Sequence, residues 1–361
     1  MSANRIVSSA RALIAGAFLL CAGGGALAQT AQGARHPDTE PAIPRFVVLP
    51  PLHPEARFSG SGLPLWNFTW TYQGRNYNGQ MVGTTPSGGA STTVPSFIIP
   101  IALKVGGKTF TTSTIQSNGQ SALADAINSP IFQAGINFVE AGVSLGNTQY
   151  IDAFQRGAFW GTVQSNQGYH LLLGQPTVLP LQTITVPKRQ GKVGTEFGVQ
   201  VALVNINFID AQIASILAAN PQITGASVPV FMTYNTYLTQ NGCCIGGYHS
   251  ANGSQSYMQY SYIGTPGAFA QDVSALSHEM GEWADDPLTN NTNTPCGIYE
   301  VGDPLENTAN YGDYPYVLNG NFTYNLQDMA WPPYFGAPPA TSLANRSTFQ
   351  GTALSVCQNG S

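Results

Sequence analysis

The chain has 361 residues, of which 43% are hydrophobic and 9% are charged, with 18 Asp and Glu against 13 Lys and Arg. This hydrophobic content is sufficient for a folded core and excludes an intrinsically disordered chain. The net charge of -5 argues against nucleic acid or an anionic membrane surface as a partner.

The first 28 residues have the pattern of a secretory signal peptide. Arg5 and Arg11 precede an apolar run that ends at Cys21, and Ala26-Leu27-Ala28 has the small-x-small form of a cleavage site. Cleavage there removes two of the 13 basic residues, so the mature chain from Gln29 has a net charge of -7. No later stretch has the roughly 18 to 20 consecutive apolar residues of a membrane span. We therefore expect a secreted or periplasmic protein.

Residues 29–62 are rich in Pro and Gly and lack periodicity, which predicts an extended leader before a single domain of residues 63–361. A subdivision of this domain near 190–200 is the alternative. Hydrophobic patterns predict strands at 67–74, 95–105, 170–173, 177–186, 198–206, 228–235 and 256–264, and helices at 121–128, 150–160 and 210–219.

The segment 271–287, QDVSALSHEMGEWADDP, predicts one further helix, with Asp272 as its N-cap and Asp286-Pro287 as its end. Residues four apart lie on one helix face, so His278 and Glu282 project together. Zinc peptidases place two metal ligands in this way in the motif H-E-x-x-H, with the intervening Glu activating water. We therefore expect His278 and Glu282 to bind zinc and Glu279 to act as a general base.

The charge distribution supports a cation site. No Lys or Arg occurs from Val193 to Asn345, whereas twelve Asp and Glu lie in that stretch. Buried carboxylates without partners cost several kcal/mol each, so such a cluster needs solvent, protonation or a cation. Glu300 is the first choice for a third zinc ligand, and Asp303 is the second. The alternative without a metal has the carboxylates solvated or paired with basic residues from elsewhere in the fold.

A calcium site that stabilises the fold is the alternative metal centre, since calcium prefers oxygen ligands. The oxygen-bearing residues that would form it are Asp285, Asp286, Asn290, Asn291 and Glu300.

His249 lies in the Gly-rich run CIGGYHS, which predicts a loop. Its imidazole is a candidate for orienting substrate, donating to an oxyanion or binding the metal, and a structural histidine is the alternative. The four cysteines of the mature chain predict two disulfides. Because Cys243 and Cys244 are adjacent, we expect them to bond to different partners, Cys296 and Cys357 in either order.

Several runs together resemble a known group of sequences. HEMGEWADDP is similar to the H-E-x-x-E-x-x-T-D-P helix of uncharacterised exported bacterial zinc peptidase-like proteins, and Glu300-Val301-Gly302-Asp303 is similar to their E-I-G-D element. Asp285 stands where those proteins usually have Thr. Further similar runs are TYQGRNYNGQMVGTTP, STTVPSFIIPIAL, QYIDAFQRGAFW, CIGGYHS and YNLQDMAW. The order of these runs also resembles, more distantly, the plant phosphate-induced or EXORDIUM family.

The order of elements predicts an α+β fold with a β-rich N-terminal half and a zincin-like metal helix in the C-terminal half. We expect a secreted zinc-dependent hydrolase, a peptidase, that acts on a peptide or protein substrate. The alternative, which the plant resemblance implies, is a non-catalytic extracellular binding or cell-wall-associated protein with a polysaccharide partner and a degenerate or calcium-bearing site.

Overall fold

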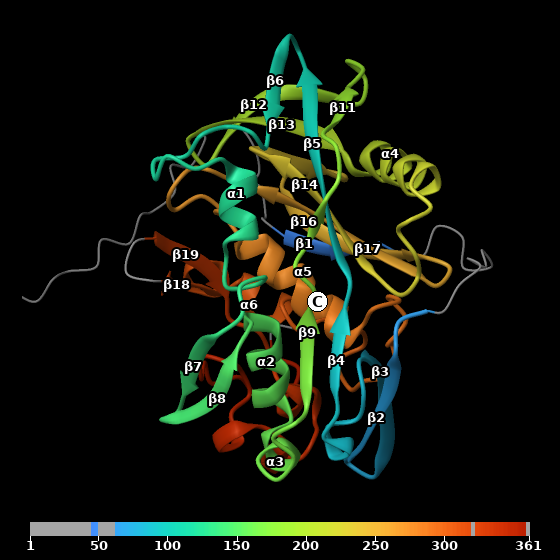
Figure 1. Ribbon diagram of the computed structural model, residues 1–361, viewed down its shortest axis with the longest axis vertical. Coiled ribbons are helices and arrows are strands. Elements are labelled where there is room, and N and C mark those ends of the chain that lie inside the picture. Colours follow the sequence, from blue (N-terminus) through green and yellow to red (C-terminus); the bar gives the residue numbers. More distant parts are fainter. Residues whose placement is uncertain (1–44, 50–61, 319–321, 359–361) are drawn as a thin grey trace, which may run out of the picture. The chain divides into compact units, whose positions relative to one another are not determined.

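The computed structural model describes residues 45–49, 62–318 and 322–358 (Figure 1). All of these residues belong to one unit, 34–361. The predicted signal peptide and most of the predicted leader lie outside the described residues. Among the residues described, no helix is long and apolar enough to cross a membrane.

The main sheet has eleven strands, eight of them in the order β10-β5-β14-β17-β16-β15-β13-β12, with β6 and β11 also paired to β5 and β1 paired to β16. Because β12 at one end of this order contacts β5, the sheet curls back toward itself. Its strands are β1 (Arg45–Val48), β5 (Ser96–Val105), β6 (Lys108–Thr111), β10 (Thr177–Val178), β11 (Gln182–Thr185), β12 (Gly191–Glu196), β13 (Val199–Asn205), β14 (Val228–Tyr234), β15 (Thr236–Thr239), β16 (Ile245–Asn252) and β17 (Gln255–Tyr262).

Four two-stranded sheets complete the strand structure. They pair β2 (Leu65–Tyr72) with β3 (Arg75–Val82), β4 (Ser91–Val94) with β9 (His170–Leu173), β7 (Ile136–Glu140) with β8 (Val143–Thr148), and β18 (Asp313–Leu318) with β19 (Phe322–Gln327). The α-helices are α1 (Ala122–Ile127), α2 (Tyr150–Ala158), α3 (Trp160–Val163), α4 (Ile206–Ala219), α5 (Ser274–Asp285) and α6 (Asp303–Glu306). Short 3-10 turns occur at Pro86–Gly88, Ala309–Gly312, Pro332–Phe335, Pro339–Thr341 and Leu343–Asn345.

The predicted fold class is wrong. Strands make up 40% and helices 22% of the structure, and the sheet is nearly closed and barrel-like rather than part of an α+β fold. Strands are also not confined to the N-terminal half, because β14 to β17 of the main sheet lie in the second half of the chain. The helix α5 packs against β16 and β17 of this barrel-like sheet, and the predicted zincin-like helix is not found.

Most of the predicted strands and helices correspond to elements of the structure, but β3, β4, β6, β7, β8, β12, β15, β18 and β19 were not predicted. Two predictions near the site are wrong. The run that contains His249 is the strand β16 rather than a loop. Asp272 does not cap α5 with its side chain, since the helix begins at Ser274 after Val273. Instead, the Asp272 carboxylate accepts hydrogen bonds from Asn325 N at 2.9 Å and Asn325 Nδ2 at 2.6 Å, which joins the start of α5 to β19.

All twelve residues of α5 are buried. The helix contacts β16 and β17 of the main sheet, and it also contacts β3, β19 and α2. Gly281 allows close packing in the middle of the helix, because a Cβ there would overlap the side chain of Met329. The polar residues of α5 therefore face protein on every side, which is unusual for a helix so rich in ionisable groups.

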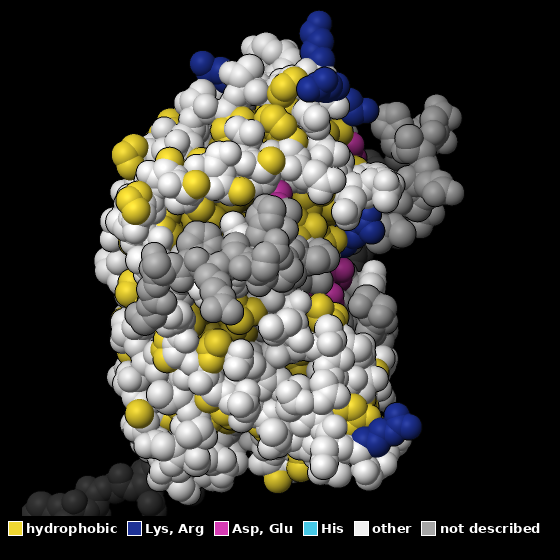
Figure 2. All heavy atoms as spheres, turned by 90° about the vertical axis from the view of Figure 1, so that its right-hand side faces the viewer, with side chains coloured by type: hydrophobic (Ala, Val, Ile, Leu, Met, Phe, Trp, Pro, Cys, Tyr) yellow, Lys and Arg dark blue, Asp and Glu magenta, His cyan; other side chains and the backbone are white. Residues whose placement is uncertain are grey.

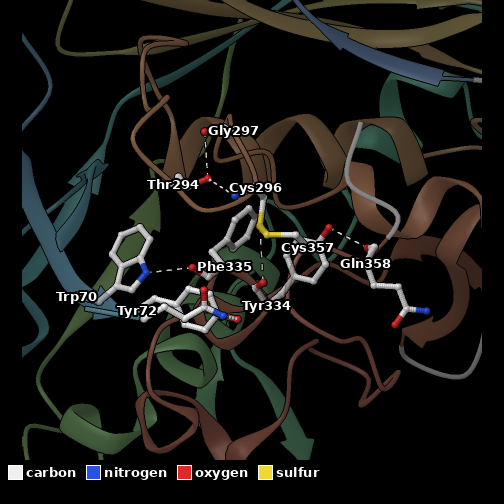
Figure 3. Close-up of a disulfide and its surroundings, with 10 residues drawn as sticks. Trp70, Tyr72, Thr294, Cys296, Gly297, Tyr334, Phe335, Cys357 and Gln358 are labelled. Atoms are coloured by element: carbon white, nitrogen blue, oxygen red, sulfur yellow. Dashed lines mark hydrogen bonds between the residues drawn. A yellow bond between two sulfur atoms is a disulfide. The ribbon is translucent and has the colours of Figure 1, made fainter. Parts of the chain in front are cut away.

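The disulfides pair differently from the prediction. Cys243 bonds to its neighbour Cys244, across a cis peptide bond, and Cys296 bonds to Cys357 with their Cα atoms 5.0 Å apart. Figure 3 shows the second disulfide beside Tyr334, whose backbone carbonyl accepts a hydrogen bond from the Cys357 amide at 3.1 Å. This bridge therefore attaches the C-terminal segment to the stretch that follows α5.

Removing the Cys296–Cys357 disulfide is expected to lower the free energy of unfolding by about 4 kcal/mol, the chain-entropy value for a loop of this length. The bridge spans 61 residues, so its loss frees a long loop in the unfolded chain. Urea unfolding of the Cys296→Ser, Cys357→Ser double variant measures the change. A loss below about 1 kcal/mol would contradict this expectation.

Candidate metal centre

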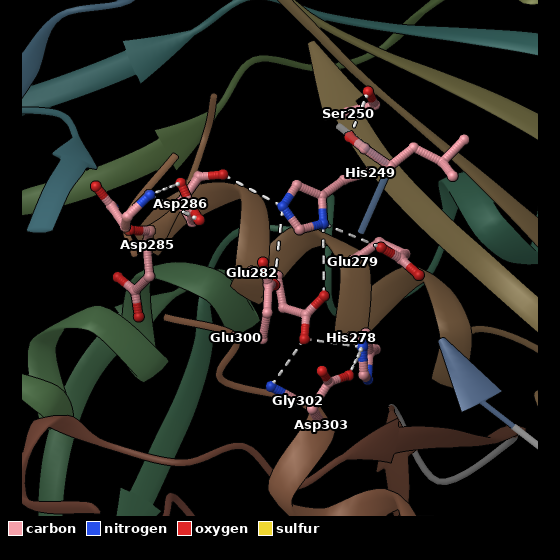
Figure 4. A network of polar contacts seen from close by, with 12 residues as sticks. His249, Ser250, His278, Glu279, Glu282, Asp285, Asp286, Glu300, Gly302 and Asp303 are labelled. Carbon is pink, nitrogen blue, oxygen red and sulfur yellow. Dashed lines mark hydrogen bonds and ion pairs between the residues drawn. The ribbon is translucent and has the colours of Figure 1, made fainter. Parts of the chain in front are cut away.

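The six residues predicted for the site come from three parts of the chain, and the structure brings them together (Figure 4). His249 lies on β16, and α5 carries His278, Glu279 and Glu282. Glu300 and Asp303 follow α5, with Asp303 at the first position of α6. All but Asp303 are buried, and the Asp303 side chain is 23% exposed.

Glu282 lies at the middle of the cluster. Its Oε1 is 2.9 Å from His278 Nε2, and its Oε2 is 3.4 Å from His249 Nδ1. The amide of Gly302 also donates a hydrogen bond to Oε1 at 3.2 Å. One carboxylate therefore faces ring nitrogens of both histidines.

Gln327 on β19 fixes the orientation of the His278 ring. Its Nε2 donates to the carbonyls of Tyr311 at 3.1 Å and Gly302 at 3.4 Å, so its Oε1 is the acceptor that faces His278 Nδ1. An acceptor at that position requires Nδ1 to carry a hydrogen. Nε2 is then the nitrogen left to bind a cation on the side of Glu282, which is the arrangement that metal-binding histidines normally have.

His249 is oriented in a similar way by the backbone. Its Nε2 lies 3.2 Å from the carbonyl oxygen of Asp286, which can only accept a hydrogen bond. Nδ1 therefore faces the carboxylates of Glu279 and Glu282, at 3.4 Å from each. The structure thus places His249 with the predicted metal ligands, although ligation was one of several roles that its sequence context suggested.

Several buried polar atoms in the cluster have no hydrogen-bond partner outside the histidine–carboxylate pairs described above. These atoms are both carboxylate oxygens of Glu279, both of Glu300, His249 Nδ1 and His278 Nε2. Most buried polar groups in proteins are hydrogen-bonded, and an unsatisfied group costs about 1–3 kcal/mol, more if it is charged. These imidazole nitrogens and carboxylate oxygens are atoms of the kind that bind metals. Their position around Glu282 is the arrangement expected of a cation site.

Two glycines make room for these side chains. A Cβ at position 302 would overlap the His278 ring, and a Cβ at position 247 would lie 2.7 Å from Glu279 Oε1. The local sequence thus leaves space for His278 and Glu279 at the points where the backbone of neighbouring segments approaches them.

Electrostatics in the cluster are dominated by negative charge. Burial raises the pKa of Glu279 to about 7, and burial together with Glu282 raises the pKa of Glu300 well above its usual range. Burial alone would lower the pKa of His278, but the Glu282 and Glu279 carboxylates raise it to about 10. The pKa of Glu282 is held low by His278 and His249 although burial opposes this. Without a metal the cluster therefore holds protons, and a cation would replace them.

Basic side chains do not neutralise this cluster. Within the described part of the chain, the ion pairs of these carboxylates are all with histidines, and the only pair that involves Arg is Arg346 with Glu140. On the face in Figure 2, Asp and Glu appear only as small patches, consistent with the burial of many acidic residues of the second half. Groups that can surround a metal ion include His249, Glu282 and Glu300; His278, Glu279 and Glu282; and His278, Asp303 and Glu306.

The residues of the calcium alternative serve other contacts. The Asp286 carboxylate accepts from the amides of Asn290 and Asn291, and Asp285 Oδ1 accepts from Gln155 Nε2 at 2.5 Å. The Asn291 side chain donates to Gln80 O and accepts from Gln80 N, each at 2.8 Å, which fixes the edge of β3. These oxygens of Asp285, Asp286 and Asn291 therefore bond to protein, and among the described residues no candidate metal-ligand group includes Asp285 or Asp286.

Comparison of the chain with protein-family models, with curated proteins and with solved structures finds no match. The resemblance to exported zinc peptidase-like sequences therefore stays a prediction, and the geometry of the cluster is the basis for any function proposed.

Carboxyl groups outside the histidine cluster predict a distinct dependence of stability on pH. Burial raises the pKa of Asp272 and of Asp285 to about 7. Between pH 4 and 7 the folded protein therefore holds protons that the unfolded chain releases, so raising the pH through this window destabilises the fold. We expect the chelator-treated protein to melt at a higher temperature at pH 5 than at pH 8.

Asp285→Asn is the matched variant for this test. The Asn amide can still bond to Gln155, whose Oε1 has no partner in the described structure. We expect the variant to be more stable than the parent at pH 8, by on the order of 1–4 kcal/mol, the free energy of a pKa shift of this size. Identical pH profiles of melting temperature for parent and variant would contradict the explanation.

Proposed function

We propose that the cluster around Glu282 binds a divalent metal, with zinc as the first candidate, and that the protein is a metal-dependent hydrolase. The observation that carries this proposal is the set of buried ligand atoms on His249, His278, Glu279 and Glu300, whose close polar contacts are histidine–carboxylate pairs gathered around one shared carboxylate. Imidazole and carboxylate are both accepted zinc ligands. Glu282 would hold the metal either with His278 or with His249 and Glu300, because it belongs to a candidate ligand group with each histidine, and Asp303 lies 3.7 Å from His278 Nε2.

A bound divalent metal supplies a Lewis acid and makes water nucleophilic near neutral pH. The residues of the chain then have separate tasks. Gln327 and the Asp286 carbonyl keep the two imidazoles oriented, and Gly302 N–H holds the central carboxylate. The Glu279 carboxylate is paired with His249 and has no further hydrogen bond in the described structure, so it can accept a proton from water and deliver it to a leaving group.

A small surface depression adjoins the cluster. It is lined by Cys296, Ile298, Glu300, Asp303, Pro304, Tyr334 and Phe335. Of the cluster residues in its lining, Glu300 is buried and the Asp303 side chain is partly exposed. Trp283 and Trp331 are buried in the core and do not line this depression.

The experiment that tests the function combines metal loading with hydrolysis. Protein purified without chelator is analysed for bound metals by plasma mass spectrometry, and is then assayed with a mixed peptide library before and after chelation. We expect zinc on the protein, and cleavage that chelator removes and added zinc restores. Folded protein that takes up no zinc would refute the proposal and favour the alternative of a non-catalytic binding protein.

A further inference from the structure

The strand β1 runs beside the part of β16 that leads to His249. The two strands are parallel, with Arg45 opposite Ile245, Val47 opposite Tyr248 and Val48 opposite His249. Backbone hydrogen bonds join Arg45 N to Cys244 O at 3.0 Å and Leu49 N to His249 O at 3.3 Å. In return, Ser250 Oγ donates to Leu49 O at 2.9 Å. An extended segment is thus held along the strand that carries a candidate ligand.

β1 occupies an edge that the rest of the sheet leaves available. The other neighbour on that side, β15, pairs with β16 only at Leu238 and Ile245. β17 covers the opposite edge of β16 along its length, from Gly247 to Asn252. In the described structure β1 pairs with no strand other than β16. Its removal would therefore expose the backbone groups of a single strand edge and leave the order of the other strands intact.

The side chain of Phe46 lies directly on the candidate metal centre. Its ring centroid is 3.8 Å from that of His278, with an angle of 33° between the planes, and it also packs against Phe269 at 5.0 Å. Gly246 forms the floor of this position, because a Cβ there would lie 3.0 Å from the Phe46 ring. Phe46 is 4% exposed, so the aromatic side chain fills its position.

A carboxylate beside the same position bonds to the backbone of β1. Glu306 accepts the hydrogen of the Phe46 amide, and it belongs with His278 and Asp303 to one of the candidate metal-ligand groups. The backbone of β1 is therefore recognised by main-chain groups of β16 and by an acidic residue of the cluster. These contacts do not depend on the identity of the side chains of β1, apart from the position that Phe46 fills.

We propose that the edge of β16 is a binding groove for an extended polypeptide with an aromatic side chain at the His278 position, and that β1 is its internal occupant. This inference rests on the proposed function, for which it names an unfolded or extended protein segment as the substrate class. Strand addition is a common mode of peptide recognition, in which the sheet edge supplies affinity and a side-chain pocket supplies specificity. Val48, two residues after Phe46, lies opposite His249. A peptide bound in place of β1 would therefore run past this residue of the cluster.

The test uses the full chain with β1 loosened. Phe46→Ala removes the side chain over His278, and Val47→Ala is the matched control on the same strand, because Val47 packs against a different hydrophobic cluster. Each protein is titrated with a fluorescent peptide of the sequence PRFVVL, in the presence of chelator. We expect Phe46→Ala to bind the peptide at least tenfold more tightly than the parent and Val47→Ala. A peptide with Ala in place of Phe is expected to bind at least tenfold more weakly.

Arg45→Pro provides a second way to loosen β1 if Phe46→Ala does not fold. It removes the amide that bonds to Cys244 O and leaves the groove itself unchanged. Increased peptide binding by either folded variant supports the groove. Folded variants that bind no better than Val47→Ala would overturn it, as would unfolding of both variants, which would show that β1 is an integral strand. Because chelator is present throughout, failure of metal binding leaves this result unaffected and the two proposals are tested separately.

Discussion

Replacing Glu282 with Gln is expected to abolish tight zinc binding. The carboxylate faces His278 Nε2 at 2.9 Å and His249 Nδ1 at 3.4 Å, so it is the one group that links both histidines. Gln keeps the shape of the side chain but removes its charge and one of its acceptor oxygens. Loss of a residue that only supports a ligand weakens metal binding roughly 10- to 100-fold. Replacing Glu282 itself is expected to weaken zinc binding by more than that factor.

Competition with a zinc-sensitive dye measures the affinities of the parent and the variant. Glu140→Gln is the control, because Glu140 is also a carboxylate in an ion pair, with Arg346 at 3.4 Å, but is not part of the cluster. We expect the control to bind zinc as the parent does. Unchanged zinc affinity in Glu282→Gln would show that Glu282 is not a metal ligand and would contradict the proposed centre.

The helix and the spacing of its ionisable residues could be predicted because both are local. His278 and Glu282 are four residues apart, and helix geometry alone places them on one face. The strand β16 was missed for the opposite reason. Its residues IGGYHSAN lack alternation, because both faces of the strand are buried. The prediction of the fold class was wrong for the same reason, because the residue pattern of a single strand does not determine which strands pair with it.

Local sequence patterns could not identify the residues that complete the site. Gln327 is 49 residues from His278 along the chain, and Phe46 is 260 residues from Glu306. The run that contains Gln327 was noticed only for its resemblance to other sequences, and Glu306 only as one more acidic residue. Phe46 lies in a Pro-rich segment that carries no periodic signal. Their roles follow from tertiary packing, which brings one amide, one carboxylate and one aromatic ring to the same buried helix.

The lack of basic residues from Val193 to Asn345 was the most useful nonlocal signal in the sequence. It showed that carboxylates on α5 and after it would find no Lys or Arg from their own half of the chain. The structure adds that the remaining basic residues do not reach them in its described part, and that histidines are their ionic partners. Composition over a long window therefore predicted the electrostatic character of the cluster, although not its geometry.

Glu279→Gln is expected to retain zinc and to lose hydrolytic activity. The Glu279 carboxylate is paired with His249 Nδ1 at 3.4 Å and has no further hydrogen bond in the described structure, so it can take a proton. Burial raises its pKa to about 7 in the metal-free protein, and a carboxylate near a bound metal can both accept and release a proton. The amide of Gln cannot do so. We expect the turnover number to fall roughly 100- to 10,000-fold, the contribution typical of general acid–base catalysis.

The comparison between Glu279→Gln and Glu282→Gln separates the two roles on α5. A base that only transfers protons leaves zinc content unchanged when it is replaced, whereas a ligand does not. We therefore expect one zinc-containing, inactive variant and one zinc-free, inactive variant, both with the circular dichroism spectrum of the parent. If Glu279→Gln instead loses zinc together with activity, Glu279 is a ligand, which its position with His278 and Glu282 in one candidate group also allows. The proton acceptor would then have to be another carboxylate of the cluster, and Glu300, whose two oxygens are also without hydrogen-bond partners, is the residue that the structure offers.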